Sequence, residues 1–267
     1  MIEHLSHQGS TVRYSVEGSG PPLLMCNGIG APFELMEPLR EELHRHTTIA
    51  WDAPGSGGSS VPLRPPSMRY VANTAAALLD HLALGSSDVL GVSWGGLVAQ
   101  ELAIHHPQRV RRLVLAATGT GWTSIPGDPM ALRAMLSVRR YTSPTYLRRV
   151  GPRLYGGDIG RDPGLLEQQS LARLRHAPSN LGYWWQATAA VWWTSMFRLG
   201  SIQQATLVMA GDDDPIAHVH NARIISSKIP NAVLELVEGG GHLFLLTRPR
   251  ASARSIERFL DGSREAA

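Results

Sequence analysis

The fold is decided by the stretch Asp88-Val89-Leu90-Gly91-Val92-Ser93-Trp94-Gly95-Gly96-Leu97-Val98-Ala99-Gln100-Glu101-Leu102-Ala103. A short apolar run typical of a buried strand is followed by a helix-like run, and Ser93 lies between them in Gly91-Val92-Ser93-Trp94-Gly95. A side chain two residues before or after the serine would collide across so tight a turn, so glycine is required at both positions. We therefore expect a strained backbone at Ser93 and a hydroxyl that stands clear of the sheet.

Two further polar side chains follow predicted strands later in the chain. The apolar run 206–210 ends in Gly211-Asp212-Asp213-Asp214-Pro215, and the run 233–237 ends in Glu238-Gly239-Gly240-Gly241-His242. The carboxyl ends of parallel strands meet at one edge of a sheet, where ligands bind. The chain order Ser, Asp, His is that of α/β-hydrolases and not that of chymotrypsin-like or subtilisin-like enzymes. His242 would take the proton of Ser93 and return it to the leaving group.

Three consecutive aspartates leave the choice of the third catalytic residue open. Asp212 is nearest to the end of the strand, whereas Asp214 is the third residue after Gly211, where related hydrolases usually carry the acid. A buried carboxylate fixes the imidazole tautomer and stabilises the imidazolium. We predict Asp214 in this role, with Asp213 as the alternative, and expect the other aspartates to be solvated or capping groups of the loop.

Two backbone N–H groups are expected to form an oxyanion hole. One belongs to Trp94, the residue after the serine. The other is predicted in Asn27-Gly28-Ile29-Gly30, the loop after the apolar run 23–26, with the N–H of Ile29 as the donor. Loss of one such donor typically costs roughly 3–4 kcal/mol of activation free energy.

The composition is that of a globular protein with a large core. The chain has 267 residues, of which 43% are apolar and 18% are charged, and this suits one domain with an insertion or two small domains. Arg-rich segments such as Arg139-Arg140 and Arg148-Arg149 are interpreted as solvated faces. Because no basic stripe alternates with aromatic residues, we expect no nucleic-acid binding. The pattern favours no particular oligomeric state.

Targeting, redox and metal signals are weak. Cys26 is the only cysteine, so no intrachain disulfide forms, and its place in a core strand predicts a buried thiol.

The N-terminus does not resemble a signal peptide and no run approaches the length of a membrane span, which predicts a cytoplasmic protein. His218 and His220 form a His-x-His pair without a further ligand at fixed spacing, so we expect rim histidines, no metal and no cofactor.

Alternating strands and helices predict an α/β fold with a mostly parallel eight-stranded sheet flanked by helices. The predicted strands span 2–6, 11–16, 23–26, 47–51, 88–90, 110–116, 206–210 and 233–237, and the predicted helices include 33–44, 68–84 and 97–103. The alternation is lost in residues 121–200, which are rich in Arg, Pro, Trp and Tyr. We therefore expect a core of residues 1–120 and 201–267, interrupted by a helical cap that covers the active-site edge.

Several motifs resemble a particular family of α/β-hydrolases, the intracellular depolymerases of medium-chain-length poly(3-hydroxyalkanoate). The motifs are Trp51-Asp52-Ala53-Pro54-Gly55-Ser56-Gly57-Gly58-Ser59, Gly91 to Gly96, Leu113 to Thr118, Arg139-Arg140-Tyr141, Leu154-Tyr155-Gly156-Gly157, Leu181-Gly182-Tyr183-Trp184-Trp185-Gln186, Trp193-Thr194-Ser195, Gly211 to Pro215 and Gly241-His242-Leu243-Phe244-Leu245. The resemblance runs from about Leu23 to Pro249 and includes the predicted cap. It implies a serine esterase acting on 3-hydroxyacyl esters, with Ser93, Asp214 and His242 as the triad and a polyester granule surface as a partner. His218, where the family usually has a proline, and Gly240, where an acidic residue is usual, depart from the pattern.

Other activities remain open at this stage. The same triad serves small-molecule esterases, lactonases, thioesterases and carbon–carbon hydrolases, and the specificity among these lies in the cap. A dehalogenase or epoxide hydrolase is disfavoured, because both need a carboxylate at position 93. A non-catalytic, ligand-binding member of the fold can also keep an intact triad.

Overall fold

The predicted eight-stranded sheet is confirmed in a computed structural model, which describes residues 2–166 and 173–262. The strand order is β1-β2-β4-β3-β5-β6-β7-β8. Strand β2 pairs antiparallel with both β1 and β4, and all other neighbours are parallel. The strands are β1 (Ile2–His7), β2 (Ser10–Gly18), β3 (Pro22–Cys26), β4 (Thr47–Trp51), β5 (Ser87–Val92), β6 (Val110–Ala116), β7 (Ala205–Gly211) and β8 (Ala232–Val237).

The middle of the sheet is buried on both faces. Every residue of β5 is buried, and β3, β6 and β7 are buried over most of their length, which explains their uninterrupted apolar sequences. The edge strands β1 and β8 have mixed exposure and mixed sequences. The strands that precede Ser93 and Asp214, β5 and β7, are thus buried on both faces, whereas β8, which precedes His242, is an edge strand.

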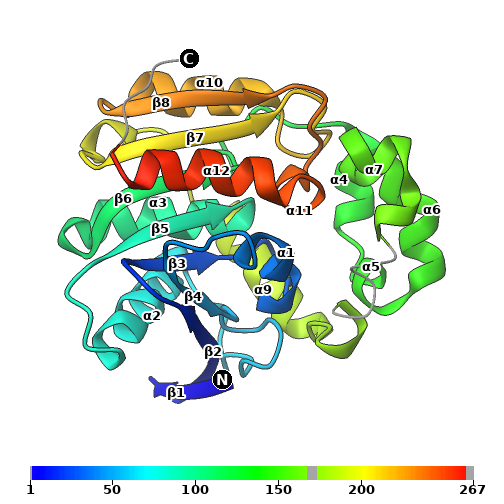
Figure 1. Cartoon of the computed structure of the whole chain (residues 1–267). Coiled ribbons are helices and arrows are strands. Elements are labelled where there is room, and N and C mark those ends of the chain that lie inside the picture. The colour runs from blue at the N-terminus through cyan, green and yellow to red at the C-terminus, as the bar shows by residue number, and fades with distance from the viewer. Residues whose placement is uncertain (1, 167–172, 263–267) are drawn as a thin grey trace.

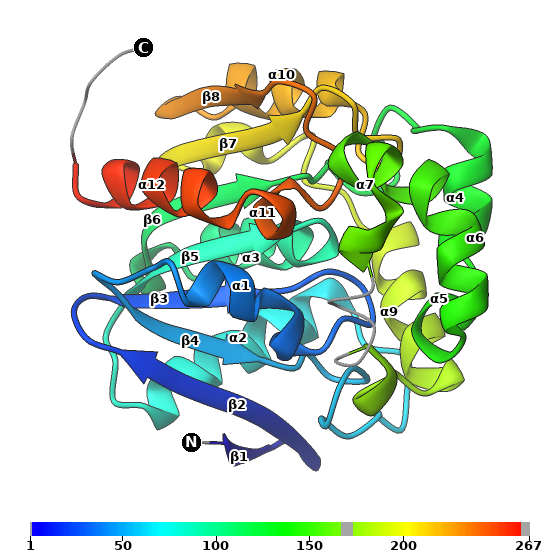
Figure 2. The same ribbon diagram turned by 45° about the vertical axis from the view of Figure 1, so that its right-hand side comes forward.

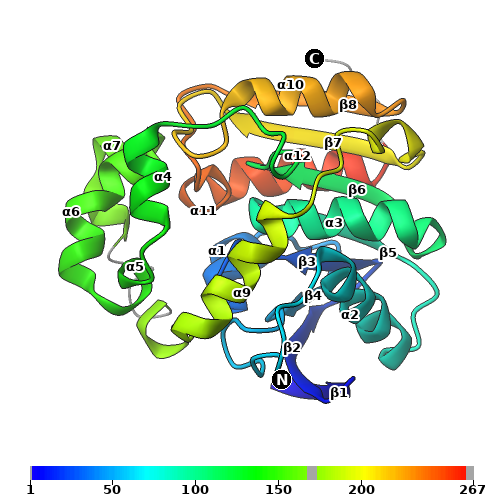
Figure 3. The same ribbon diagram turned by 180° about the vertical axis from the view of Figure 1, so that it is seen from behind.

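Helices cover both faces of the sheet (Figures 1 to 3). One face carries α2 (Met68–His81), α3 (Trp94–His105) and α10 (Val219–Lys228), which contribute to one apolar cluster with the strands. The other face carries α1 (Glu37–Arg40), α11 (Phe244–Thr247) and α12 (Pro249–Leu260), which contribute to a second cluster. Each cluster forms one layer of the core, so the sheet is held rigidly between them.

The helix predicted over 33–44 is wrong in length and partly in type. Residues Phe33–Met36 form a 3₁₀ turn, only α1 is α-helical, and turns follow it. The predicted helix over 68–84 ends earlier, at His81, and the helix predicted over 97–103 is longer, because α3 begins directly at Trp94 and continues to His105. The N-terminal end of α3 therefore lies immediately beside Ser93.

Helices fill the segment between β6 and β7. Residues 121–200, called the insertion below, contain α4 (Pro129–Met135), α5 (Arg139–Thr142), α6 (Pro144–Tyr155), α7 (Gly157–Arg161) and α9 (Asn180–Val191). The two ends of the insertion meet, because Gly121 pairs with Thr194 and the N–H of Trp122 donates to the carbonyl of Trp193 at 3.1 Å. Figure 2 shows these helices beyond the tips of the central strands. Within the described residues, no helix combines the length and apolarity needed to cross a membrane.

Candidate active site

Ser93 occupies a strained turn between β5 and α3. Its φ is 54° and its ψ is −118°, a region that residues other than glycine rarely occupy. A Cβ on Gly91 would lie 2.6 Å from the Cβ of Ala99, and a Cβ on Gly95 would lie 2.1 Å from the carbonyl oxygen of Cys26. The turn is held by a hydrogen bond from the Ser93 N–H to the carbonyl of Ala116, 2.9 Å long. The two glycines let the chain turn this sharply.

Gly95→Ala is expected to destabilise the protein and to reduce its activity, because the new methyl group would overlap backbone that cannot retreat. Overpacking of this kind typically costs about 1–3 kcal/mol of unfolding free energy, and more where backbone is involved. Thermal unfolding monitored by circular dichroism measures the loss. Gly85→Ala is the matched control, since a Cβ there meets no atom of the described residues within 4 Å. Equal melting temperatures for the two variants would contradict this account of the turn.

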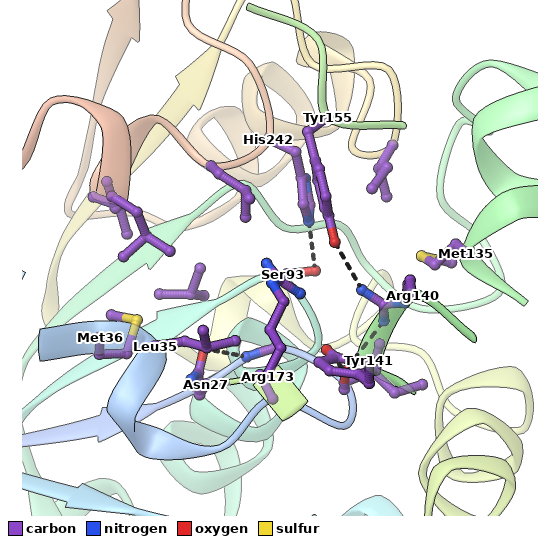
Figure 4. A pocket seen from close by; sticks show the side chains of 18 residues that line it. Asn27, Leu35, Met36, Ser93, Met135, Arg140, Tyr141, Tyr155, Arg173 and His242 are labelled. Atoms are coloured by element: carbon purple, nitrogen blue, oxygen red, sulfur yellow. Dashed lines mark hydrogen bonds between the residues drawn. The ribbon is translucent and has the colours of Figure 1, made fainter. Parts of the chain in front are cut away.

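Ser93, His242 and Asp214 form a continuous chain of hydrogen bonds. The Nε2 atom of His242 lies 3.0 Å from the Oγ of Ser93 (Figure 4), and its Nδ1 lies 2.8 Å from Oδ2 of Asp214. The three residues come from three strand ends: Ser93 follows β5, Asp214 follows β7 and His242 follows β8. His242 and Asp214 are buried, with side-chain exposures of 7% and 0%. The arrangement has a nucleophile, a base within reach of it, and a carboxylate that orients the base.

Of the three aspartates, Asp214 is the one that contacts His242. Its second oxygen, Oδ1, accepts hydrogen bonds from the N–H groups of Ile216 and Ala217 at 2.8 and 2.9 Å, so the carboxylate has little freedom. Asp212 accepts instead from the N–H of Gly239, and Asp213 from the N–H of Gly157. Both are exposed loop carboxylates that hold backbone.

The loop that carries His242 is fixed by the insertion. The N–H of His242 donates to the carbonyl of Tyr155, at the end of α6, over 2.7 Å. A Cβ on Gly241 would lie 2.3 Å from the same carbonyl, so the two segments touch backbone to backbone. The position of the imidazole therefore depends on α6 as well as on β8.

Both predicted oxyanion donors lie beside Ser93. Ile29 and Trp94 line a cavity together with Ser93. The first N–H groups of a helix lack intrahelical acceptors, and Trp94 is the first residue of α3. Among the described residues, no backbone or side-chain acceptor pairs with the N–H of Ile29. Both residues therefore border the cavity at Ser93, and their role as oxyanion donors stays a prediction.

Two cavities meet at Ser93. The larger, of about 380 Å³, is lined mainly by apolar side chains on the side of α3, α4 and α9. The smaller, of about 50 Å³, contains Ser93 and His242 together with Arg140, Arg173 and two tyrosines. Figure 4 shows Arg140 between Tyr155 and Tyr141, to one side of Ser93. The smaller cavity also has many apolar residues in its lining, so its charged and hydroxyl groups occupy only part of the wall.

The interpretation of Arg139-Arg140 as a solvated face is wrong for Arg140. Its side chain is buried, and its guanidinium donates to the hydroxyl groups of Tyr155 and Tyr183 and to the carbonyl of Ile29. The guanidinium also lies 4.5 Å from the centre of the Tyr141 ring, a favourable cation–π distance. Sequence reasoning missed this residue because an Arg-Arg pair between polar segments is typical of a surface, and only Arg139 is exposed.

Cys26 is buried close to the serine turn. Burial raises the pKa of its thiol to about 12. A thiol with so high a pKa stays protonated at neutral pH and is a poor nucleophile. Cys26 is therefore no competitor to Ser93.

The His218 and His220 pair lies at the start of α10. The N–H of His220 donates to Nδ1 of His218 at 3.3 Å, which makes His218 the N-cap of the helix. No group of three or more metal-ligating side chains occurs within residues 2–166 and 173–262. The pair thus has a local structural role in capping α10.

Comparison with known proteins places the chain among hydrolases. A family model described as alpha/beta hydrolase fold matches residues 21–249. The chain is 44% identical to a protein named poly(3-hydroxyalkanoate) depolymerase from Ectopseudomonas oleovorans, over 96% of this chain and 91% of the relative. It is 25% identical to 3-oxoadipate enol-lactonase 2 from Acinetobacter baylyi, over 95% and 94% of the two chains. A crystal structure of a hydrolase from Pseudomonas aeruginosa superposes with a TM-score of 0.81 at 26% identity, covering 97% and 98%.

Proposed function

The chain belongs to the α/β-hydrolase fold family, and from this we propose that it is a serine carboxylic ester hydrolase with Ser93, Asp214 and His242 as its catalytic triad. The observation that carries the proposal is the unbroken pair of hydrogen bonds from Ser93 through His242 to Asp214, of 3.0 and 2.8 Å. A serine hydroxyl is a weak nucleophile at neutral pH and needs a base at this distance.

The reaction proceeds through an acyl-enzyme. The Oγ of Ser93 attacks the ester carbonyl carbon while its proton passes to Nε2 of His242. Asp214 holds the proton on Nδ1 and stabilises the imidazolium. The tetrahedral intermediate then expels the alcohol, which takes the proton from His242. Water, deprotonated by His242, attacks the acyl carbon, and the carboxylic acid leaves as Ser93 regains its proton.

The negative charge of the tetrahedral intermediate falls on the former carbonyl oxygen. We assign its stabilisation to the backbone N–H groups of Ile29 and Trp94, which border the same cavity as Ser93. Removing one donor of this kind typically lowers kcat about 10²–10³-fold. Because both donors are backbone atoms, no change of the Ile29 side chain removes them.

For the substrate, we propose 3-hydroxyacyl esters such as poly(3-hydroxyalkanoate). The 44% identity to a protein of that name extends through the insertion, which forms most of the pocket wall. An apolar cavity of about 380 Å³ beside Ser93 suits an aliphatic acyl group. Its lining includes Leu97, Trp122, Ile125, Leu132, Met135, Leu136, Val191 and Ile216.

A polyhydroxyoctanoate latex is expected to clear when the purified protein is added, and the medium to gain 3-hydroxyoctanoate. Turbidity and liquid chromatography of the acid measure the two effects, with p-nitrophenyl octanoate as the soluble reference ester. The apolar cavity is the physical reason, since it accepts the alkyl side chain of the polymer. Hydrolysis of the soluble ester without any loss of turbidity would contradict the polymer as substrate.

Likeness to an enol-lactonase favours a second candidate, hydrolysis of a small ester or lactone with the same triad. At 25% identity this likeness is weaker than that to the depolymerase. A panel of short esters and lactones, assayed beside the latex, separates the two candidates.

A polymer-degrading enzyme must meet an apolar surface, and the rim of the larger cavity offers one. Trp122, Leu136 and Val191 line the cavity yet are 63%, 52% and 61% exposed. Trp192, which follows Val191 in the chain, is 87% exposed. Exposed apolar side chains gathered at a pocket mouth favour binding to an apolar surface. We propose that this rim, in a cap formed by residues 121–200, rests on polyester granules in the cytoplasm.

Trp122→Ser combined with Trp192→Ser is expected to reduce sedimentation with polyhydroxyoctanoate granules at least severalfold. Hydrolysis of soluble p-nitrophenyl acetate should stay within about twofold, because both tryptophans are mostly exposed whereas His242 and Asp214 are buried. Ile2→Ser is the control, since Ile2 is also exposed, at 54%, but lies on edge strand β1. Unchanged sedimentation of the double variant would contradict the proposed granule contact.

A further inference from the structure

The loop that carries Ile29 is a β-turn whose middle peptide is held by residues from the insertion. The turn is closed by a hydrogen bond from the N–H of Ala31 to the carbonyl of Gly28, at 3.1 Å. Its third residue, Gly30, has a φ of +67°, as a type II turn requires. Types I and II differ by rotation of the middle peptide, here the peptide between Ile29 and Gly30. The orientation of that peptide is thus the main internal freedom of the turn.

Three hydrogen bonds from the insertion fix this peptide. The carbonyl of Ile29 accepts from the hydroxyl of Tyr141 at 2.6 Å and from Nη2 of Arg140 at 3.2 Å. The N–H of Gly30 donates to Oε1 of Gln186 at 2.8 Å. All three side chains are buried, so each bond is shielded from competing water. Residues of α5 therefore hold the carbonyl of this peptide, and a residue of α9 holds its N–H.

Gln186 also contacts the second oxyanion segment. Its backbone carbonyl accepts from Nε1 of Trp94 at 2.9 Å, and its Nε2 donates to the carbonyl of Pro54 at 3.0 Å. One fully buried residue of α9 thus touches the loop after β3, the start of α3 and the loop after β4. It thus links the turn that follows Ile29 to the indole of Trp94, although the backbone N–H groups of Ile29 and Trp94 take no part in these bonds.

Arg140 places a buried positive charge beside the carbonyl of Ile29. Its partners are tyrosine hydroxyls and the Ile29 carbonyl, and no carboxylate among the described residues pairs with it. A cation in a poorly solvated site stabilises nearby negative charge more strongly than it would in water. It borders the same small cavity as Ser93 and His242.

We propose that Arg140, Tyr141 and Gln186 are positioning residues: by fixing the peptide after Ile29 and the indole of Trp94, they hold in place the two residues whose backbone N–H groups are assigned to the oxyanion hole. The insertion then acts on the chemical step itself and not only on the shape of the pocket. This inference rests on the proposed esterase function. It assigns to the insertion a role in kcat, whereas a simple pocket wall would act mainly on KM.

The test uses Tyr141→Phe, which deletes one hydroxyl, and Gln186→Leu, which keeps a similar volume without polar atoms. For p-nitrophenyl octanoate, kcat should fall about 10-fold to 100-fold, less than the loss of an entire donor, while KM changes less than threefold. Affinity for 1-octaneboronic acid, whose tetrahedral serine adduct places an oxygen in the oxyanion hole, should fall by the same factor. Tyr146→Phe is the matched control, because Tyr146 lies on α6 of the insertion, where its ring contacts Arg139 and its N–H donates to Ser143.

The outcomes separate this inference from the proposed function. Wild-type protein without any esterase turnover would overturn the proposed function. The affinities of wild type and variants for 1-octaneboronic acid, measured from the shift in melting temperature, would still test the inference. Unchanged kcat and boronic-acid affinity in both variants would overturn the inference. So would a fall in kcat that parallels a lowered melting temperature and is matched by Tyr146→Phe, since that pattern indicates general loosening of the insertion. Loss of kcat and of boronic-acid affinity at an unchanged melting temperature supports it.

Discussion

Ser93→Ala is expected to abolish hydrolysis of p-nitrophenyl octanoate, lowering kcat by about 10⁶-fold, the scale of nucleophile loss in serine hydrolases. The reason is that the acyl group is transferred to Oγ of Ser93, and alanine offers His242 no hydroxyl to deprotonate. The fold should survive, because the backbone bond from residue 93 to Ala116 does not involve the side chain. Release of p-nitrophenol measures activity, and circular dichroism measures folding.

Ser227→Ala serves as the control for this loss. Ser227 is exposed on α10, and its hydroxyl donates to the carbonyl of Ile224, so activity should equal that of the wild type. Retention of multiple-turnover activity by a folded Ser93→Ala protein would show that another group is the nucleophile.

Asp214→Asn is expected to lower kcat by about 10⁴-fold with little change in KM, as for the equivalent change in other serine triads. Asparagine can present an N–H to Nδ1 of His242, which would place the imidazole proton on Nε2 and prevent that atom from accepting the serine proton. Steady-state kinetics with p-nitrophenyl octanoate measure the effect.

The neighbouring aspartates provide matched controls. Asp212→Asn and Asp213→Asn keep an oxygen that can accept from Gly239 and Gly157 respectively, so both should retain kcat within a few-fold. A large loss in Asp213→Asn together with normal activity in Asp214→Asn would transfer the role to Asp213 and contradict the observed hydrogen bond.

The sheet could be predicted from the sequence because each central strand is a short apolar run between turn residues. The buried strands β3, β5, β6 and β7 carry this signal most strongly. The apolar spacing of residues 33–44 predicts one helix, whereas the chain there packs as a 3₁₀ turn followed by one α-helical turn at Glu37–Arg40. Tertiary packing determines the conformation of this segment, so the local sequence pattern does not predict it.

In the candidate site, too, some residues can be predicted from local sequence and others cannot. Ser93, Asp214 and His242 each follow a strand within a few residues, so a local motif marks each of them. Arg140 and Gln186 reach the loop after β3 across 111 and 156 positions of sequence, and no local pattern indicates such contacts. Their roles depend on how the insertion folds back over the strand ends.

The most direct test of the account is to identify the covalent intermediate. Protein mixed with excess p-nitrophenyl octanoate and quenched in acid within the first turnover should gain the mass of one octanoyl group, and peptide mapping should locate that group on Ser93. The same experiment with Ser93→Ala should show no adduct. An octanoyl group on another residue, or turnover without any acylated protein, would contradict the proposed mechanism.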